Sequence, residues 1–146
     1  MIRNESGYEC VIQTLRTANV LWRESRRFFR PFGISEAQFN VLNLLGQSPE
    51  GMSQRELSDR LLVDRSNVTL LLDRMEKKGW IVRHDVPGDR RVYRVILTRT
   101  GKALWQRILP SYHRTVEGIV RGLSASDIRS SMQTLKAIEL QSTKWK

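Results

Sequence analysis

Basic and amide side chains gather in two short segments of this chain. Residues 65–74 read RSNVTLLLDR, and residues 85–98 read DVPGDRRVYRVILT. An arginine can donate two parallel hydrogen bonds to a guanine edge or to a phosphate, an asparagine can pair with adenine, and a threonine methyl can touch thymine. These residue types therefore favour reversible contact with a nucleic-acid duplex rather than the making or breaking of covalent bonds.

A helix must present the first of these segments. Asp64 is a good N-cap residue, and Gly79 supplies the left-handed residue that often follows a helix. The apolar side chains between them share an inner face, formed by Val68, Leu71, Leu72 and Met75. The polar side chains fall largely on the open face, where we expect them to contact DNA: Arg65, Ser66, Asn67, Thr69 and Arg74.

A shorter helix precedes this one and begins with a capping box, Ser53 with Glu56. Two short helices with a tight break between them, the second polar near its start, are the helix-turn-helix pattern. Free N–H groups at a helix start favour a phosphate, so Ser53, Gln54 and Arg55 are candidate phosphate contacts. A purely capping role is the alternative for these three residues. Three basic residues after the longer helix are weaker candidates, because such charges often cover a solvent face: Lys77, Lys78 and Arg83.

A β-hairpin must carry the second segment. The sequences WIVRH and VYRVILT read as two strands, with Pro87 and Gly88 in the connection. A hairpin directly after a recognition helix is the wing of a winged helix. Because the minor groove narrows and becomes more negative at A·T-rich sequence, an inserted arginine is held there by shape and potential. Asp89, Arg90 and Arg91 are therefore candidate DNA contacts, with Asp89 orienting a neighbouring guanidinium.

Long helices are predicted at both ends of the chain. From Tyr8 to Phe29 apolar residues recur at gaps of three and four, and Pro31 with Gly33 should end this helix. A second long apolar pattern contains Pro110, where we expect a kink rather than two separate helices. A capping box, Ser35 with Gln38, should open a helix that closes at Gly46, and Ser124 should cap the last helix.

These elements predict a mainly α fold with a small β-hairpin wing, a winged helix-turn-helix. We expect a DNA-binding lobe at 35–100, flanked by helical segments 1–34 and 101–146 that pair two chains in a homodimer. A single winged helix would bind weakly, whereas a twofold pair sets two recognition helices about 34 Å apart on a pseudo-palindromic site. Closure of a monomer by the same apolar residues is the alternative.

The order of helices, wing and flanking helices resembles the MarR family of bacterial transcriptional regulators. That family carries an Asp-x-Arg motif in the wing and Leu-Thr-x-x-Gly after it, here Asp89 with Arg91, then Leu97, Thr98 and Gly101. The segment NVTLLLDRMEKKGWIVR is also similar to the family's recognition helix and its exit. The resemblance implies that Arg91 enters the minor groove, while Arg90 meets phosphate. It also implies a sequence-specific regulator of transcription, most often a repressor.

The resemblance further implies release from DNA by a small effector, often an anionic aromatic compound. Rings beside a cation would suit such a ligand, and Trp22, Arg26, Phe39 and Trp105 are the candidate pocket residues. Ordinary core or interface roles for most of these four are the alternative. A branch of the family senses peroxide through cysteine, which makes Cys10 a candidate thiol switch. Phe39 stands where that branch tends to offer a tyrosine hydroxyl, which weighs against this function.

Composition supports a nucleic-acid partner and excludes several other classes. The chain has 146 residues, with 25 Lys and Arg against 15 Asp and Glu, so its net charge is +10. Cys10 is the single cysteine, which favours a reducing cytoplasm, and no apolar run is long enough for a membrane span. Cys10, His84 and His113 are too scattered for a metal site, and no nucleophile elbow or phosphate loop indicates an enzyme or a cofactor. A winged helix that binds proteins instead of DNA is the alternative from another class.

Overall fold

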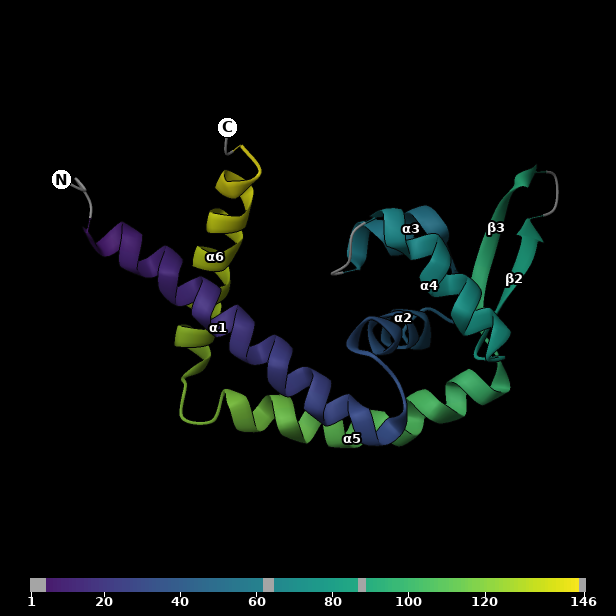
Figure 1. The fold of residues 1–146 in the computed structure, drawn as a ribbon, viewed down its shortest axis with the longest axis horizontal. Helices are drawn as coiled ribbons and strands as arrows, with labels where there is room; N and C mark the ends of the chain where they lie inside the picture. Colours follow the sequence, from purple (N-terminus) through teal and green to yellow (C-terminus); the bar gives the residue numbers. More distant parts are fainter. Residues whose placement is uncertain (1–4, 62–64, 87–88, 145–146) are drawn as a thin grey trace. The chain divides into compact units, whose positions relative to one another are not determined.

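The computed structural model describes residues 5–61, 65–86 and 89–144, without the side chains of residues 65 and 89–92. The expected fold class is confirmed, since helices dominate and one small antiparallel sheet accompanies them (Figure 1). The elements in chain order are α1 (Glu5–Phe29), the 3-10 turn η1 (Arg30–Phe32), α2 (Glu36–Gly46), β1 (Met52–Ser53), α3 (Gln54–Arg60), α4 (Arg65–Lys77), β2 (Ile81–Val86), β3 (Asp89–Leu97), α5 (Arg99–Ile119) and α6 (Ala125–Ser142).

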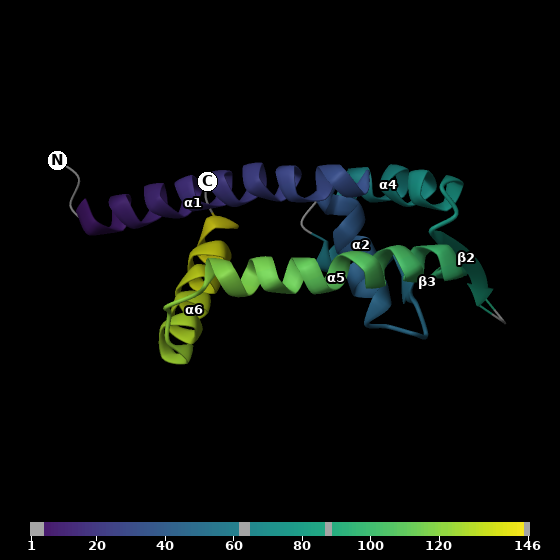
Figure 2. The same ribbon diagram turned by 90° about the horizontal axis from the view of Figure 1, so that it is seen from below.

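Helix boundaries follow the local signals in the sequence. Helix α1 gives way to the turn η1, which contains Pro31 and is followed by Gly33 at φ 68°, as expected. Gly79 lies beyond α4 at φ 71°. Helix α5 runs through Pro110 as one element, which confirms one helix rather than two (Figure 2). A proline in a helix interior removes one backbone hydrogen bond and can kink a helix without ending it.

Three helices begin with reciprocal capping boxes. The side chains of Ser35, Ser53 and Ser124 each accept a hydrogen bond from a backbone N–H three residues on. The Ser53 backbone N–H donates to Glu56, and this hydrogen bond, with that from the Ser53 side-chain cap, lowers the pKa of the Glu56 carboxyl. At α6 the Ser124 hydroxyl donates to Asp127 and lowers the pKa of Asp127 in the same way. The sequence alone identified all three cap serines.

The sheet has the strand order β1-β3-β2 and is antiparallel throughout. Strand β1 was not expected, because it contains only two residues and pairs far along the chain, Met52 with Val95. Gly51 precedes it at φ 73°, and a Cβ there would lie 2.6 Å from the Val95 carbonyl oxygen and 2.7 Å from Ile96 Cγ1. This contact also explains why apolar Ile96 breaks the alternation of β3: its side chain packs on Gly51.

Helix α2 ends at Gly46, as the sequence predicts, and its C-cap residue Gln47 lies in the right-handed region. A Cβ on Gly46 would lie 2.5 Å from the Trp105 ring, so this glycine is required for close packing of α2 on α5.

The chain divides into two compact units, of which unit 2 comprises residues 26–112. Its core is apolar and closed, and the inner face predicted for α4 is confirmed, because Val68, Leu72 and Met75 are fully buried. Phe29, Phe39 and Tyr112 form an aromatic cluster, with centroids 4.7 Å apart for Phe29–Phe39 and 4.6 Å for Phe39–Tyr112. Unit 2 extends past both ends of the predicted 35–100 lobe because Phe29 and the first turns of α5 complete this core.

A tight joint connects β3 to α5 within unit 2. The Thr98 hydroxyl donates to the Gly79 carbonyl at 2.6 Å and accepts from the Gly101 N–H at 3.0 Å. The Thr98 N–H donates to the Trp80 carbonyl at 3.1 Å, and a Cβ on Gly101 would lie 1.9 Å from that same oxygen. The Thr-x-x-Gly spacing is therefore a packing requirement: the threonine ties two chain segments together, and only glycine fits where they meet.

Unit 1 comprises residues 1–25 and 113–146 and lacks a core of this kind. None of its described residues is buried. Large apolar side chains are exposed along α1, the end of α5 and α6, including Leu15 at 56%, Ile119 at 59% and Leu135 at 48%. Monomeric proteins rarely leave so many large apolar side chains in water on one compact unit.

Candidate nucleic-acid interface

Helix α4 presents an exposed face opposite its buried one. Ser66, Asn67, Thr69 and Arg74 are all exposed, as the sequence predicts. Leu70 lies among them and is 51% exposed, a feature that sequence reasoning missed. An apolar residue in a recognition face can contact the thymine methyl, so this face combines hydrogen-bonding groups with one apolar group.

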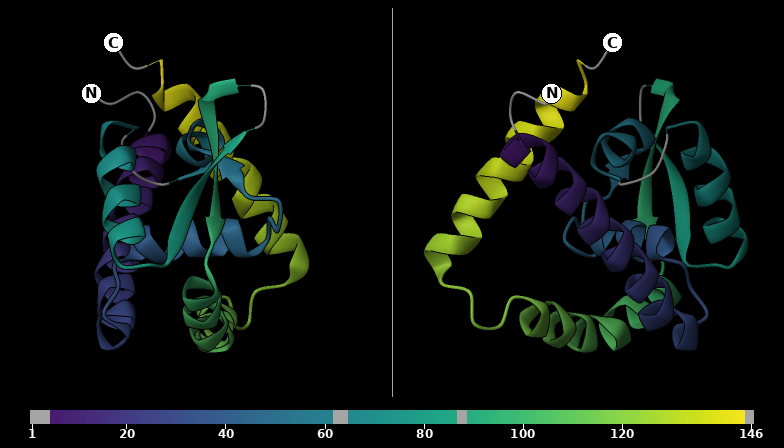
Figure 3. Two further views of the ribbon diagram at one scale, coloured as in Figure 1. Left: turned by 90° about the vertical axis from the view of Figure 1, so that its right-hand side faces the viewer. Right: turned by 60° about the vertical axis from the view of Figure 1, so that its left-hand side comes forward.

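Strand β2 and its hairpin partner β3 lie beside α4 (Figure 3). The hairpin register pairs Ile81 with Leu97 and Asp85 with Tyr93, and an irregularity follows at Asp85 and Val86. The main chain of Asp89, Arg90 and Arg91 belongs to β3, but their side chains lie outside the described part of the chain, as does the Arg65 side chain at the start of α4. Asp64, Pro87 and Gly88 lie outside it entirely. The predicted roles of these residues stay predictions.

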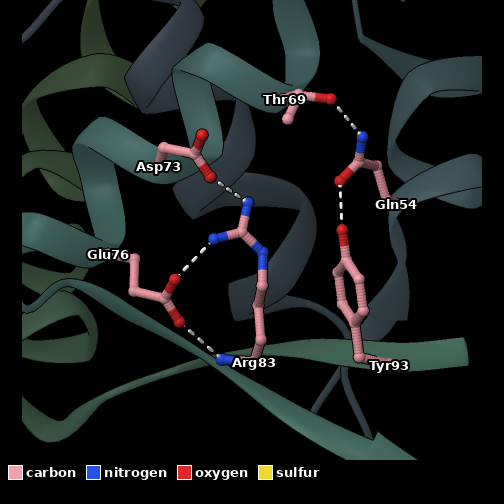
Figure 4. A network of polar contacts seen from close by, with 6 residues as sticks. All are labelled: Gln54, Thr69, Asp73, Glu76, Arg83 and Tyr93. Carbon is pink, nitrogen blue, oxygen red and sulfur yellow. Dashed lines mark hydrogen bonds and ion pairs between the residues drawn. The ribbon is translucent and has the colours of Figure 1, made fainter. Parts of the chain in front are cut away.

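Arg83 holds α4 against the hairpin, a role that sequence reasoning missed. Its guanidinium pairs with Asp73 at 2.6 Å and with Glu76 at 2.5 Å, and its backbone N–H donates to Glu76 at 3.0 Å (Figure 4). Only 17% of the side chain is exposed, so Arg83 does not cover a solvent face. Burial lowers the pKa of Arg83, but hydrogen bonds from Asp73 and Glu76 outweigh it and raise the pKa above its ordinary value. The residue therefore stays charged.

A second bridge joins α3, α4 and β3 through the amide of Gln54. The Tyr93 hydroxyl donates to Gln54 Oε1 at 2.6 Å, and Gln54 Nε2 donates to Thr69 Oγ1 at 2.6 Å (Figure 4). Tyr93 is half-buried, and the Arg83 guanidinium lies 5.4 Å from its ring centroid. Both ends of the Gln54 amide are thus engaged within the protein. This bridge and the contacts of Arg83 meet at Tyr93.

The start of α3 gives the candidate phosphate contacts different surroundings. Ser53 caps the helix, and the Glu56 carboxylate accepts from the Ser53 N–H. Arg55 is exposed, and nearby Arg94 donates from Nε to the Glu50 carbonyl at 3.0 Å. Of the three residues predicted here, Arg55 is the one whose side chain is exposed and whose charge suits a phosphate.

The four candidate effector residues are spread over both units. Trp22 lies in unit 1, and Arg26 lies at the edge of unit 2. Phe39 is fully buried in the aromatic cluster, and Trp105 donates from Nε1 to Asn43 Oδ1 at 3.1 Å. Phe39 therefore has a core role, and a pocket formed by the four stays a prediction.

The thiol switch at Cys10 stays a prediction. Cys10 is an exposed residue of α1. Among the residues described, no group of three His, Cys, Asp or Glu side chains could hold a metal ion. Within the same residues, none of the helices has the length and apolar character to cross a membrane.

Comparison with known proteins adds a family to this geometry. A model of the MarR family matches residues 32–92. The transcriptional activatory protein BadR of Rhodopseudomonas palustris is 31% identical over 83% of this chain and 71% of its own length. The transcriptional repressor MprA of Escherichia coli is 31% identical over 73% of this chain, which spans 61% of that relative. A crystal structure of a mutant MarR from Escherichia coli complexed with operator DNA has a TM-score of 0.74 at 26% identity, covering 94% of this chain and 98% of that one.

Proposed function

The chain belongs to the MarR family of transcriptional regulators, and we propose that it binds a pseudo-palindromic operator in double-stranded DNA as a homodimer. The observation that carries this proposal is the exposed polar face of α4, held to the hairpin by Arg83 and Gln54. A recognition helix fixed in this way can enter the major groove without first having to be ordered.

Base reading is assigned to the exposed face of α4. Asn67 suits adenine, Arg74 suits guanine or phosphate, and Leu70 suits a thymine methyl. Ser66 and Arg65 lie in the first turn of α4, where a recognition helix meets base edges. Around this face we propose phosphate contacts by Arg55 and by the first turn of α3.

The wing is assigned to the minor groove beside the recognition site. Arg91 would enter it, Arg90 would contact phosphate, and Asp89 would orient a guanidinium. We expect Arg91→Ala to weaken binding on the order of tenfold at sites with A·T-rich flanks and less at G·C-rich flanks. Fluorescence anisotropy with the two kinds of flank measures this difference. Equal binding of Arg91→Ala and the parent at every flank would contradict the assignment.

The homodimer is supported by the exposed apolar side chains of unit 1. A second copy of the chain would remove the exposed half of Leu15, Ile119 and Leu135 from water, and each would contribute about half of the roughly 1.5–3 kcal/mol that complete burial of such a side chain gives. A twofold axis would then repeat the α4 face on two half-sites about 34 Å apart. The relatives include both a repressor and an activator, and we propose repression.

Control by a small aromatic ligand completes the proposal. Of the four candidate pocket residues, Trp22, Arg26 and Trp105 would contact such a ligand, because Phe39 is buried in the core. The protein would carry out no catalysis, and it would act in the cytoplasm, where its DNA target lies.

A salt titration with the DNA immediately upstream of the protein's own gene tests DNA binding. Each phosphate that the protein neutralises releases counterions, so the logarithm of the affinity should fall with the logarithm of salt at a slope of several units. A scrambled duplex of equal length measures specificity. A flat response, or equal affinity for both duplexes, would favour the alternative of a winged helix that binds proteins.

A further inference from the structure

The Thr69 hydroxyl is the exposed end of a hydrogen-bond chain that starts at Tyr93. The chain passes from β3 through Gln54 at the start of α3 to the open face of α4 (Figure 4). We propose that Tyr93 and Gln54 orient this hydroxyl as a donor, so that Thr69 selects a base with an acceptor atom in the major groove. The proposal rests on the proposed function, because it assigns a specificity-determining role within the DNA interface.

The hydrogen-bond chain fixes which groups donate and which accept. A glutamine amide has one accepting end and one donating end, and a hydroxyl can both donate and accept. The Tyr93 hydroxyl donates to Oε1 at 2.6 Å, so Nε2 faces Thr69 and donates to Oγ1 at 2.6 Å. The Thr69 hydroxyl oxygen accepts a hydrogen bond from Gln54, so its own hydrogen must point elsewhere. Among the residues that the structure describes, none accepts it.

Arg83 keeps the first member of the chain in place. Its guanidinium lies 5.4 Å from the Tyr93 ring centroid and is itself held by Asp73 and Glu76 of α4. In the register Arg83 pairs with Val95, which puts Tyr93 at the diagonal position, within reach of a long side chain. A ring fixed in this way keeps the phenol hydroxyl within hydrogen-bond distance of Gln54 Oε1.

The direction of the chain has a consequence for base choice. In the major groove guanine offers N7 and O6, adenine N7 and thymine O4 as acceptors, whereas cytosine offers only its N4 amine as a donor. The Thr69 oxygen uses one of its two lone pairs for Gln54, and this hydrogen bond polarises its own O–H toward donating outward, so an acceptor at the contacted base is favoured over the cytosine amine. Without the chain, the hydroxyl could turn either way and would lose this discrimination. The hydroxyl, rather than the methyl, is thus the reading group of Thr69.

The experiment measures the affinity of the full-length protein for an operator and for all its single-base variants. Thr69→Val keeps the shape and removes the hydroxyl, so discrimination against cytosine at one position should fall about fivefold. Tyr93→Phe should remove most of the same discrimination, about threefold, at the same position. Gln54→Met removes the amide at the centre of the hydrogen-bond chain and leaves the residues of β3 unchanged, so it should reproduce the Tyr93→Phe result. The double variant Tyr93→Phe with Thr69→Val should be no worse than Thr69→Val at that position.

Thr69→Ser is the matched control, because it keeps the hydroxyl and removes the methyl. We expect it to keep the discrimination against cytosine, and its loss there would overturn the hydroxyl assignment. The salt slope and the unfolding temperature of Tyr93→Phe should match those of the parent, which separates positioning from a structural defect.

The remaining outcomes are also decisive. Equal weakening by Thr69→Val at every base would identify a phosphate contact and overturn the proposal. If both Tyr93→Phe and Gln54→Met kept the parent's base preferences, the hydrogen-bond chain would set no direction at Thr69, although DNA binding itself would stand. A parent protein that binds no duplex would reject the proposed function and this inference together.

Discussion

Units 2 and 1 of this protein both contain helices with periodic apolar residues, but they differ in how far these residues are buried. In unit 2 the inner faces of α2, α4 and the sheet are buried, and the side chains of Phe39 and Leu72 are only 1% and 0% exposed. In unit 1, Leu15 and Leu135 are about half exposed. Apolar residues recur with helical spacing in both units, so the spacing predicts a helix in each. It does not predict whether the apolar face of that helix is covered by the same chain or by a second copy. Unit 2 is complete within one chain, whereas unit 1 is the part that a second copy would complete.

The substitution with the largest expected effect on this difference is Phe39→Ala. This substitution removes the centre of the aromatic cluster, and we expect the free energy of unfolding to fall by about 3–5 kcal/mol. Urea unfolding should show the same loss at every protein concentration, because the cluster lies within one chain. Leu15→Ala is the comparison, and its effect should shrink as the protein is diluted and dissociates. Concentration-independent loss in both variants would break the contrast between the units.

A charged pair on α6 tests the assembly directly. Met132→Glu with Leu135→Glu would place carboxylates in the proposed interface, so the Kd of the dimer should rise on the order of 100-fold. Sedimentation equilibrium gives the Kd, and operator affinity should fall with it. The matched control is Gln133→Glu, which adds a charge between the same two positions. A dimer that survives the paired substitution would locate the interface elsewhere.

Arg83→Met measures what the polar contacts of unit 2 contribute. Methionine keeps part of the stem, but Asp73 and Glu76 lose their partner, and we expect a loss of about 1–2 kcal/mol because the pair remains partly screened by water. Combined with Glu76→Gln, the loss should be less than additive in a double-mutant cycle. Full additivity would indicate that the two side chains act independently.

The smallest expected effect is a pH dependence shared by both units. The pKa values of Glu56 in unit 2 and Asp127 in unit 1 are lowered by their capping serines. A lowered pKa stabilises the folded chain above the ordinary carboxyl pKa of about 4, and this stabilisation is lost as the pH falls through the lowered value. Amide exchange in the first turns of α3 and α6 should therefore rise in acid. Ser53→Ala removes the side-chain hydrogen bond but keeps the Ser53 backbone N–H that donates to Glu56, so it should reduce the acid-dependent part in α3 without abolishing it and should leave that of α6 unchanged.

The sequence predicts features that depend on neighbours along the chain. The capping serines, the end of α1 at Pro31 and the buried face of α4 all follow from residues within one or two turns, and all are confirmed. Strand β1 escapes prediction because its pairing with Val95 spans the whole DNA-binding segment. The Tyr93–Gln54 bridge joins residues 39 apart, and only the folded chain brings them together.

Within the candidate site the same limit separates exposure from function. Periodicity placed Asn67, Thr69 and Arg74 on the open face correctly. It could not show that Gln54 and Arg83 turn inward, since polar residues at such positions face solvent in most helices and hairpins. The polar side chains that we propose to contact DNA and those that align them are of the same residue types, and only the distances between their atoms separate the two groups.

The joint at Thr98 has one more consequence. Thr98 forms hydrogen bonds with Gly79 and Trp80, and Gly101 packs against the Trp80 carbonyl. The start of α5 is therefore held closely against the exit of α4. A tilt of the first turns of α5 would move the exit of α4 with it, because the two segments meet at this joint.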